Sequence, residues 1–334
     1  MKALKRASVV MLESNVDGRW QHETSTILEV LRSHHPNERD YHEVAPPSER
    51  TQLAIREDLS DRCAGLTDLV SAIRERLLDS CAVFVPKLGL NAFDTGTRAM
   101  LSYAIGACLG NPTATDKQQV IWDVKARKVD APGFITFSET DLEATFHSDS
   151  AFSAAPEPTF LLYCMEAARC GGGMSRVCDA RALRRDIDRT QPWITDVLAN
   201  RELPFRVPSA FLKSGDRNAV QATLAPVFAD SPLIRYRRDT LLEGLEHFPQ
   251  YDDPDARRAL DAFDRLLNAS PHVADFFMPR DSLVVMDNHR ALHARTAFRD
   301  QARHLLRIRL AWDNAPAYTS GYQTVARVHE SVAS

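Results

Sequence analysis

The sequence predicts a mixed α+β protein, because two regions of the chain have different patterns and the composition is that of an ordinary globular protein. Residues 1 to about 115 combine helical apolar spacing with a short buried run, whereas from about 118 onward short apolar runs alternate with Gly, Pro and Asp turns. Many short strands with long insertions are typical of a jelly roll wrapped by helices. We therefore predict a double-stranded β-helix (jelly-roll, cupin-type) core with flanking helices and a long inserted lid region.

Composition and charge restrict the class of protein. Of 334 residues, 44% are hydrophobic and 26% are charged, which provides for a sizeable core in a single domain, 1–334. A net charge of −4 argues against nucleic acid or an anionic membrane surface as a partner. No run approaches the roughly 20 apolar residues of a membrane span. Six scattered cysteines without a CxxC pair, and no secretion signal, predict a cytoplasmic protein.

The N-terminal part, about 1–115, is predicted to contain helices and a strand. Residues 60–82 carry apolar positions at helical spacing after a Ser/Asp start, and the following CAVFVPKL is typical of a short buried strand. A second amphipathic helix is predicted over 93–110, ending at a Gly110 C-cap. The dipeptide Asn111-Pro112 then predicts a turn.

The jelly-roll core is predicted over about 118–313. An insertion over about 205–278 is too long for a simple connection and is typical of a lid or substrate wall. The predicted strands are QQVIWDVKA, GFITF, TFLLYCMEAA, SRVCDA, LIRYR, DSLVVMD and HLLRIRLAW, and the inserted helices are ARALRRDIDR and ARRALDAFDRLLNAS.

The segment FHSDSAF contains a candidate metal site. On a strand, His147 and Asp149 would point to the same side and could reach one ion. Two imidazoles and one carboxylate hold a non-haem Fe(II) and leave positions open for other ligands. A lone H-x-[DE] pair is nevertheless expected about once by chance in such a chain. A third ligand must come from DSLVVMDNHRALHARTAF, where the chemistry alone leaves the choice between His289 and His293 open.

Three arginines mark the last predicted strand. Arg303, Arg307 and Arg309 lie on or beside RHLLRIRLAW, and Arg307 and Arg309 would share one face. An arginine that points into a barrel is costly unless an anion pairs with it, so the pattern indicates a bound carboxylate. The alternative is an edge strand with solvated arginines.

The order FHSDSAF, PEPTFLLYCMEAARCGGGMSRVCDAR, MDNHRALHARTAF and RHLLRIRL resembles the Fe(II)/2-oxoglutarate-dependent oxygenases of the clavaminate synthase-like, taurine-dioxygenase-related (TauD/TfdA) group. In that family H-T/S-D/E precedes A-F, and the distal histidine lies in D-N-x-R-x-x-H-G/A-R-x-x-F. The resemblance spans about 80–313. It implies that His147, Asp149 and His293 bind the iron, while His289 falls on a position usually held by another polar residue.

The same resemblance implies the cosubstrate site and the cofactors. Arg307, fourteen residues after His293, would bind the far carboxylate of 2-oxoglutarate. Ser175, in GGGMSRV, matches a threonine that binds the same carboxylate in the family. The implied cofactors are Fe(II), 2-oxoglutarate as cosubstrate, and O₂. Because Asp149 retains a carboxylate, hydroxylation is expected in place of halogenation, with desaturation or ring closure left open.

The chain departs from the family where substrate binds. Ala311 occupies the position four residues after the cosubstrate arginine, where many relatives carry a second arginine for an acidic group. In SPLIRYRRD, Arg235 or Arg237 is expected to face an anionic or polar group of the substrate, and the alternative is a solvated strand. Ser138 and Glu139 are expected to line the substrate pocket, with Glu139 available to a substrate ammonium.

The predicted function is oxidation of an unactivated C–H bond in a small amino-acid-derived substrate of specialised metabolism. One alternative is a metal-dependent cupin enzyme that does not use 2-oxoglutarate and has no need of Arg307. The other is a non-catalytic binding barrel, against which the His147, Asp149 and His293 set argues, because buried ligands without a metal are costly.

Overall fold

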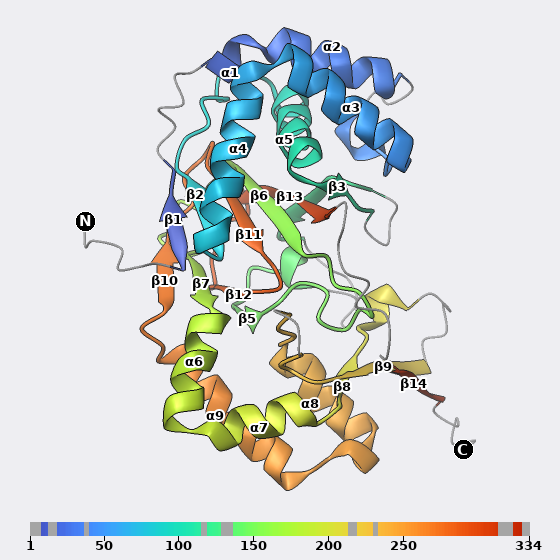
Figure 1. Ribbon diagram of the computed structural model, residues 1–334, viewed down its shortest axis with the longest axis vertical. Coiled ribbons are helices and arrows are strands. Elements are labelled where there is room, and N and C mark those ends of the chain that lie inside the picture. Colours follow the sequence, from blue (N-terminus) through green and yellow to red (C-terminus); the bar gives the residue numbers. More distant parts are fainter. Residues whose placement is uncertain are drawn as a thin grey trace.

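Two β-sheets face each other in the middle of the molecule, with helices above and below them (Figure 1). The computed structural model describes residues 8–12, 19–36, 40–114, 119–127, 136–212, 219–229, 233–312 and 323–328. Within this part the protein is a mixture of helices and three sheets. The α+β prediction is therefore confirmed.

The larger sheet has the strand order β1-β2-β11-β6-β13-β3, and β4 also pairs with β13. Its pairs are antiparallel except for the parallel pair of β1 and β2. Strand β13 lies between β6 on one side and β3 and β4 on the other, so it is no edge strand. The strands are β1 (Val9–Met11), β2 (Ala82–Val85), β3 (Asn111–Pro112), β4 (Trp122–Lys125), β6 (Thr159–Glu166), β11 (Leu283–Asp287) and β13 (His304–Ala311).

The helices of the N-terminal part cover the outer face of this sheet (Figure 1). Helix α5 lies directly on it, since a Cβ on Gly106 would meet Ile308 and Leu161 at 3.4 Å. Helices α4 and α5 confirm the helices predicted over 60–82 and 93–110. Each helix begins later and ends earlier than its prediction. The elements are α1 (Arg19–His22), α2 (Thr24–His34), η1 (Tyr41–Glu43), α3 (Glu49–Arg62), α4 (Ala64–Asp79) and α5 (Thr95–Leu109).

The end of α5 differs from its prediction. Gly110 is the C-cap, but its backbone is extended and not left-handed. A Cβ at Gly110 would lie 2.7 Å from the carbonyl oxygen of Ala311, so the glycine permits a close approach to β13. The chain therefore continues as strand β3, and the predicted turn at Asn111-Pro112 is wrong.

The smaller sheet has the order β10-β7-β12-β5 and is antiparallel throughout. Its inner face packs on that of the larger sheet, because Val177 and Ala291 share a core cluster with Phe160 and Met286. The strands are β5 (Ala144–His147), β7 (Ser175–Asp179), β10 (Val273–Phe276) and β12 (Ala291–Arg295).

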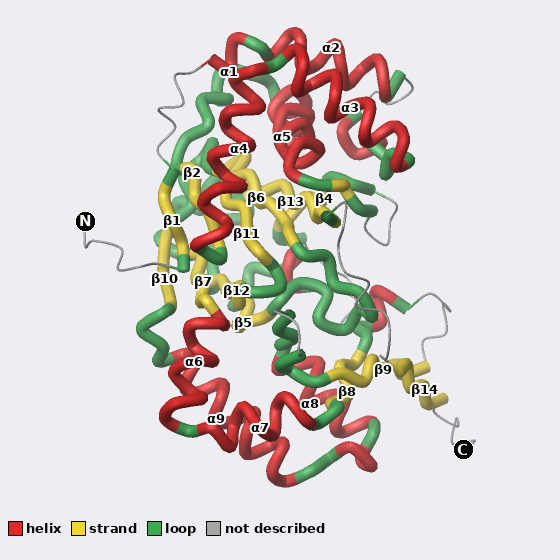
Figure 2. Tube along the Cα trace, viewed as in Figure 1, coloured by secondary structure: helices red, strands yellow, loops and turns green. Residues whose placement is uncertain are grey.

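A separate helical layer with a third sheet, β14-β9-β8, lies below the small sheet (Figure 2). Most of it comes from the predicted insertion at about 205–278. It packs on the small sheet, because Phe205, Tyr236 and Phe263 share an apolar core with Phe146 and Leu292. The elements are α6 (Ala180–Thr190), α7 (Pro192–Asn200), β8 (Leu203–Arg206), η3 (Ser209–Phe211), β9 (Ala219–Ala225), α8 (Arg238–His247), η4 (Pro249–Tyr251), α9 (Pro254–Asn268) and β14 (Gln323–Val328).

Most predicted core elements are confirmed, and two strands are not. LIRYR forms only isolated bridges, Phe228 with Ile234 and His147 with Arg237, so the strand prediction there is wrong. In GFITF, residues 133–135 lie outside the described residues, and Phe137 begins the 3₁₀ helix η2 (Phe137–Glu139). The confirmed elements are β4, β6, β7, β11, β13, α6 and α9.

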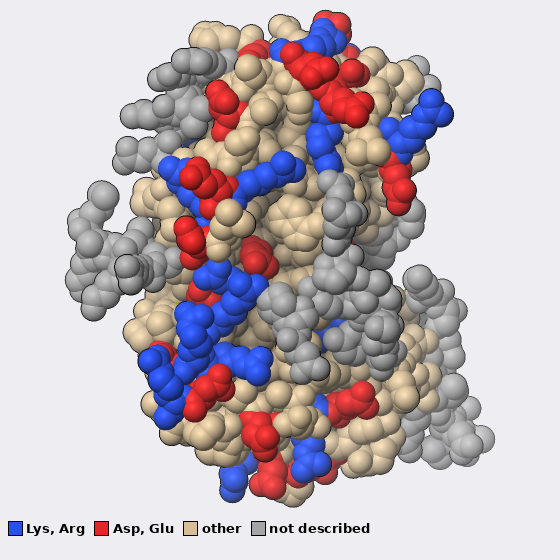
Figure 3. Space-filling view, viewed as in Figure 1, with Lys and Arg blue, Asp and Glu red and all other residues tan. Residues whose placement is uncertain are grey.

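The surface in view carries charges of both signs (Figure 3). Two arginines of α6 have acidic partners, with Arg189 paired to Asp186 and Arg184 to Asp188.

In the described part of the chain, no helix is both long and apolar enough to span a membrane.

Candidate active site

His147, Asp149 and His293 converge between the two sheets. His147 ends β5 and lies opposite His293 in the register of β5 with β12. The Nε2 atoms of His147 and His293 lie 3.8 and 3.7 Å from Oδ1 of Asp149. The three ligating atoms all lie within 4.8 Å of one another, and no other such set of His, Cys, Asp or Glu occurs among the residues the structure describes.

Asp149 is positioned by a turn and not by the strand. Because β5 ends at His147, the expectation that both ligands share a strand face is wrong for Asp149. The side chain of Asn288 holds the turn: its Oδ1 accepts from the Asp149 amide at 2.8 Å, and its Nδ2 donates to the Asp149 carbonyl at 3.0 Å. The same Nδ2 donates to the carbonyl of Glu157 at 2.7 Å.

The two imidazoles suit a metal ion. Nδ1 of His147 lies 2.7 Å from the Thr145 carbonyl and donates to it, which leaves the lone pair of Nε2 for a ligand. The rings of His147 and His293 lie side by side with centroids 4.2 Å apart. Burial lowers the pKa of both imidazoles, so both are neutral, as metal ligands must be.

Two arginines of β13 surround the carboxylate. Nη1 of Arg307 lies 3.0 Å from Oδ2 of Asp149, and Nε of Arg309 lies 3.7 Å from the same atom. Burial alone would raise the pKa of Asp149, but Arg307 and Arg309 hold it below its usual value. The predicted shared face of the two arginines is confirmed, and the alternative of solvated arginines on an edge strand is wrong.

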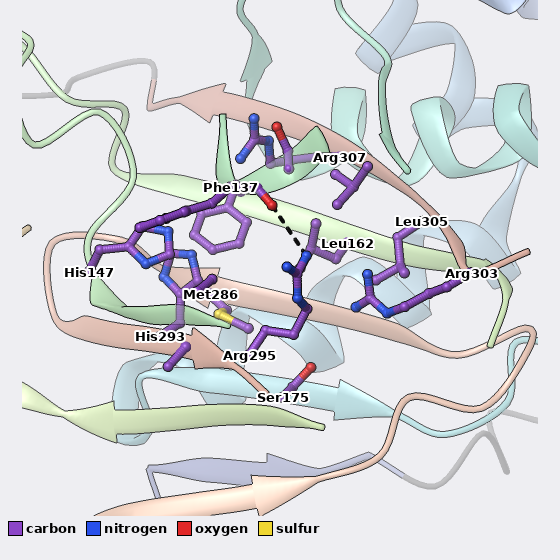
Figure 4. A pocket seen from close by; sticks show the side chains of 15 residues that line it. Phe137, His147, Leu162, Ser175, Met286, His293, Arg295, Arg303, Leu305 and Arg307 are labelled. Carbon is purple, nitrogen blue, oxygen red and sulfur yellow. Dashed lines mark hydrogen bonds between the residues drawn. The ribbon is translucent and has the colours of Figure 1, made fainter. Parts of the chain in front are cut away.

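A cavity opens beside the two histidines (Figure 4). The space inside it, counted together with the open solvent at its mouth, amounts to about 570 Å³. His147, His293, Ser175, Arg307 and Ser138 all contribute to its lining. The other lining side chains are Val124, Phe137, Ala144, Phe160, Leu162, Met286, Ala294, Arg295, Arg303 and Leu305.

Comparison with known proteins identifies the family. Residues 40–309 match the family described as "Taurine catabolism dioxygenase TauD, TfdA family". The chain belongs to the TauD/TfdA family. The family prediction from the four sequence motifs is thereby confirmed, and with it the assignment as a dioxygenase.

Solved structures similar to this TauD/TfdA protein share its fold. An asparagine oxygenase in complex with Fe(II), 2S,3S-3-hydroxyasparagine and succinate has 19% identity and a TM-score of 0.62, over 91% of this chain and 93% of that chain. The non-heme iron oxygenase OrfP with Fe and alpha-ketoglutaric acid has 16% identity and a TM-score of 0.63, over 93% and 98%. OrfP with Fe, succinate and (3R,4R)-dihydroxy-L-Arg has 16% identity and a TM-score of 0.64, over 91% and 94%. No curated protein is significantly similar in sequence.

His289 lies apart from His147, Asp149 and His293, the candidate metal-binding set, in this TauD/TfdA protein. Its Nε2 lies 2.9 Å from the carbonyl oxygen of Pro156, and the side chain is buried. Burial lowers its pKa, so the neutral ring donates to that carbonyl. The structure therefore brings His293 to His147 and Asp149, in agreement with the resemblance.

The expected substrate residues occupy different surroundings. Arg235 is fully buried and donates to the carbonyls of Ala151, Ser153 and Ala154, which favours a role in holding that loop and not in contacting substrate. It does not line the cavity described above. Ser138 lines that cavity and is 8% exposed.

Arg237 and Glu139 each have a charged partner already. Nε and Nη2 of Arg237 donate to the carboxylate of Asp239 at 2.9 to 3.2 Å, and its guanidinium stacks on Phe137 at 4.3 Å. One carboxylate oxygen of Glu139 lies 3.7 Å from Nη1 of Arg127. A substrate group would have to compete with these partners.

Three residues of the site were not singled out as site residues from the sequence. Asn288 orients Asp149, and Arg295 and Arg303 line the cavity. Asn288 and Arg295 are fixed positions of the motif D-N-x-R-x-x-H-G/A-R-x-x-F, which could have identified them. Arg303 was recognised only as part of an arginine-rich strand, because its neighbours in space come from other elements.

Proposed function

We propose that this protein is an Fe(II)/2-oxoglutarate-dependent oxygenase that hydroxylates an unactivated C–H bond of a small amino-acid-derived substrate. The observation that carries the proposal is the convergence of His147, Asp149 and His293 at the wall of a cavity, with their ligating atoms within 4.8 Å. Two neutral imidazoles and one charged carboxylate form the donor set that non-haem iron oxygenases use, and it leaves positions open on the cavity side.

Each residue has a proposed role. His147, Asp149 and His293 would hold the iron, which together with O₂ and the 2-oxo acid supplies the oxidising power for the C–H bond. Arg307 and Ser175 would hold the far carboxylate of 2-oxoglutarate, since a guanidinium binds a carboxylate with two hydrogen bonds. Apolar side chains such as Phe160 and Leu162 exclude water from the cavity.

The finer description of the fold is also proposed. We infer that the two facing sheets form the double-stranded β-helix and that residues of about 205–278 form a lid. This is supported by the position of the candidate metal-binding set between the sheets and by the packing of the inserted layer on the small sheet. We further propose one domain over 1–334 and a cytoplasmic location, the latter because no disulfide joins the six cysteines.

The substrate class follows from the similar structures. Their bound molecules are hydroxylated forms of L-asparagine and L-arginine. By analogy we propose a free or derivatised amino acid as substrate. Ser138 would contact it directly, Glu139 could meet its ammonium group, and Arg237 could meet an anion after release from Asp239.

The test is succinate release from 2-oxoglutarate in the presence of Fe(II), screened against amino acids and their derivatives. Wild type and His289→Ala should turn over the substrate, whereas His293→Ala should not. Loss of turnover in His289→Ala but not in His293→Ala would contradict the assignment. Turnover that survives Arg307→Ala and omission of 2-oxoglutarate would indicate a different cupin enzyme, and absence of iron binding would indicate a non-catalytic barrel.

A further inference from the structure

Arg309 lies beside one of the two carboxylate oxygens of Asp149. It is on β13, and its Nε lies 3.7 Å from Oδ2 of Asp149. The other oxygen, Oδ1, lies 3.8 and 3.7 Å from the Nε2 atoms of His147 and His293. The carboxylate therefore presents one oxygen to the two histidines of the candidate metal-binding set and the other to Arg309.

The backbone of Arg309 is fixed on both sides of its strand. On one side it pairs with Phe160 of β6, whose ring centroid lies 5.0 Å from that of His293. On the other side, the amide of Thr113 donates to the carbonyl of Arg309 at 3.0 Å. The sheet therefore holds the base of this side chain beside the candidate metal-binding set.

The guanidinium of Arg309 has an unused donor. Its Nε is buried without a hydrogen bond, and Asp149 is its one ion-pair partner among the residues that the structure describes. At 3.7 Å this contact is too long for a hydrogen bond, so the pair is held by charge. Only 12% of the Arg309 side chain is exposed, and a buried cation is unfavourable unless an anion pairs with it. Asp149 supplies that anion.

Arg307 contacts the same carboxylate in a different way. Its Nη1 lies 3.0 Å from Oδ2 and 3.4 Å from Oδ1 of Asp149, so it reaches the oxygen that faces the histidines. A metal ion at Oδ1 would repel Arg307, and the proposed function gives Arg307 a second anion, the far carboxylate of 2-oxoglutarate. The contact of Arg309 is with Oδ2, and Arg309 can keep it while Oδ1 binds a metal ion.

We propose that Arg309 is a positioning residue that holds Oδ2 of Asp149, so that the carboxylate offers only Oδ1 to the iron. This inference rests on the proposed function. A carboxylate that bound through both oxygens would take a position that the 2-oxo acid and O₂ need. The positive charge of Arg309 also makes Asp149 a weaker donor, so the site binds Fe(II) less tightly than the same three ligands without this arginine.

The first test measures Fe(II) affinity by anaerobic competition with a coloured chelator. Arg309→Met should bind Fe(II) about 10-fold more tightly than wild type, because it removes a positive charge and frees Oδ2 of Asp149. Arg309→Lys retains the charge and should stay within about threefold of wild type. Arg299→Met, at an exposed arginine between β12 and β13, is the matched control and should change nothing. Weaker or unchanged Fe(II) binding by Arg309→Met, or an equal gain in Arg309→Lys, overturns the proposal.

The second test distinguishes this role from direct binding of the cosubstrate. Fe(II)-loaded protein is titrated anaerobically with 2-oxoglutarate or with 2-oxopentanoate, which lacks the far carboxylate, and the visible absorption that chelation of a 2-oxo acid produces reports binding. Arg309→Met should weaken both ligands about 10-fold, since the freed Oδ2 competes for the position that they take. Unchanged affinity for both overturns the proposal. A loss confined to 2-oxoglutarate would assign Arg309 to the far carboxylate and also overturns it.

A second variant keeps the test available if Arg309→Met does not fold. Arg309→Gln removes the charge but remains polar, and the same changes in both affinities are expected of it. If wild type binds Fe(II) but neither 2-oxo acid, the proposed function fails, whereas the Fe(II) affinities still decide the role of Arg309.

Discussion

Asn288 determines where the carboxylate ligand lies. One side-chain amide satisfies both the N–H and the C=O of Asp149 and reaches Glu157 as well. Asn288 is 1% exposed, so water does not replace these bonds in the folded protein. Asp149 also lies beside Ser150, whose φ of 55° is uncommon for a residue other than glycine. The turn therefore depends on a side chain that belongs neither to the candidate metal ligands nor to the lining of the cavity.

We expect Asn288→Ala to weaken Fe(II) binding about 10- to 100-fold, because residues that orient metal ligands contribute affinity on this scale. The iron-to-protein ratio after dialysis against a competing chelator measures the effect. Asn268→Ala, at an exposed asparagine near the end of α9, should bind iron as wild type does. Unchanged affinity in Asn288→Ala would show that the turn holds Asp149 without the amide.

At the scale of elements, a polar cluster connects η1 with two strands of the larger sheet. The carboxylate of Asp123 on β4 lies 2.7 Å from Nε2 of His42 and 2.7 Å from Nε2 of His304 at the start of β13. Burial would raise the pKa of Asp123, but the two histidines lower it to about 2. Burial likewise would lower the pKa of His42, and the hydrogen bond and charge of Asp123 raise it.

The cluster predicts a pH dependence of stability. Since the pKa of His42 is raised by folding, its contribution is fully present below the unfolded value of about 6.5 and is lost as pH rises through the folded pKa. His42→Ala should therefore lower the free energy of unfolding by about 0.5–1 kcal/mol at about pH 5.5 and by less at about pH 8.5, a small effect because His42 is 39% exposed. Urea unfolding at both pH values measures it. His22→Ala, at an exposed histidine, serves as control, and an equal effect of His42→Ala at both values would exclude a charge interaction.

Elements with a strong local pattern were predictable, and those defined by distant partners were not. The apolar runs of β6, β11 and β13 show a buried strand in the sequence alone. Helix α3 was missed because its charged sequence offers few apolar positions, with Ile55 and Leu59 as its buried aliphatic residues. The small third sheet was missed because its strands depend on pairing across the inserted layer.

The candidate site was also predictable only in part, because some of its features depend on residues that are distant in sequence. Motif order identified His147, Asp149 and His293, and the structure brings them together. The spacing of His147 and Asp149 could not show that β5 ends between them, because the residue that fixes the turn, Asn288, is 139 positions away. Nor could it show that Arg235 would be fully buried against the 151–154 loop.

At the scale of the whole molecule, the candidate metal-binding set joins two parts of the chain that are far apart in sequence. His147 ends β5 and Asp149 follows that strand, whereas His293 lies on β12, and the fold alone makes them neighbours. An unfolded chain cannot offer these three side chains together, so a metal ion bound by them would stabilise the folded state.

We expect saturating Fe(II) to raise the melting temperature by about 4 °C, which corresponds to about 2.7 kcal/mol at a free metal concentration of about 100 times Kd. Anaerobic thermal unfolding with and without a chelator measures the shift. His293→Ala should lose most of it, while His289→Ala should keep it. A shift of equal size in His293→Ala would show that the metal binds elsewhere.

The guanidiniums of Arg307 and Arg309 lie beside the carboxylate of Asp149. We therefore expect the binding of a metal ion and the binding of the 2-oxo acid to affect each other. A divalent cation that approaches the three candidate ligands meets the positive charges of Arg307 and Arg309, and Asp149 is the charge that attracts it. A dianion meets a field that is already favourable to it. Binding of the dianion therefore lowers the repulsion felt by the iron, and thermodynamic reciprocity requires each to raise the affinity of the other by the same factor. Retention of iron would then increase with the concentration of the 2-oxo acid.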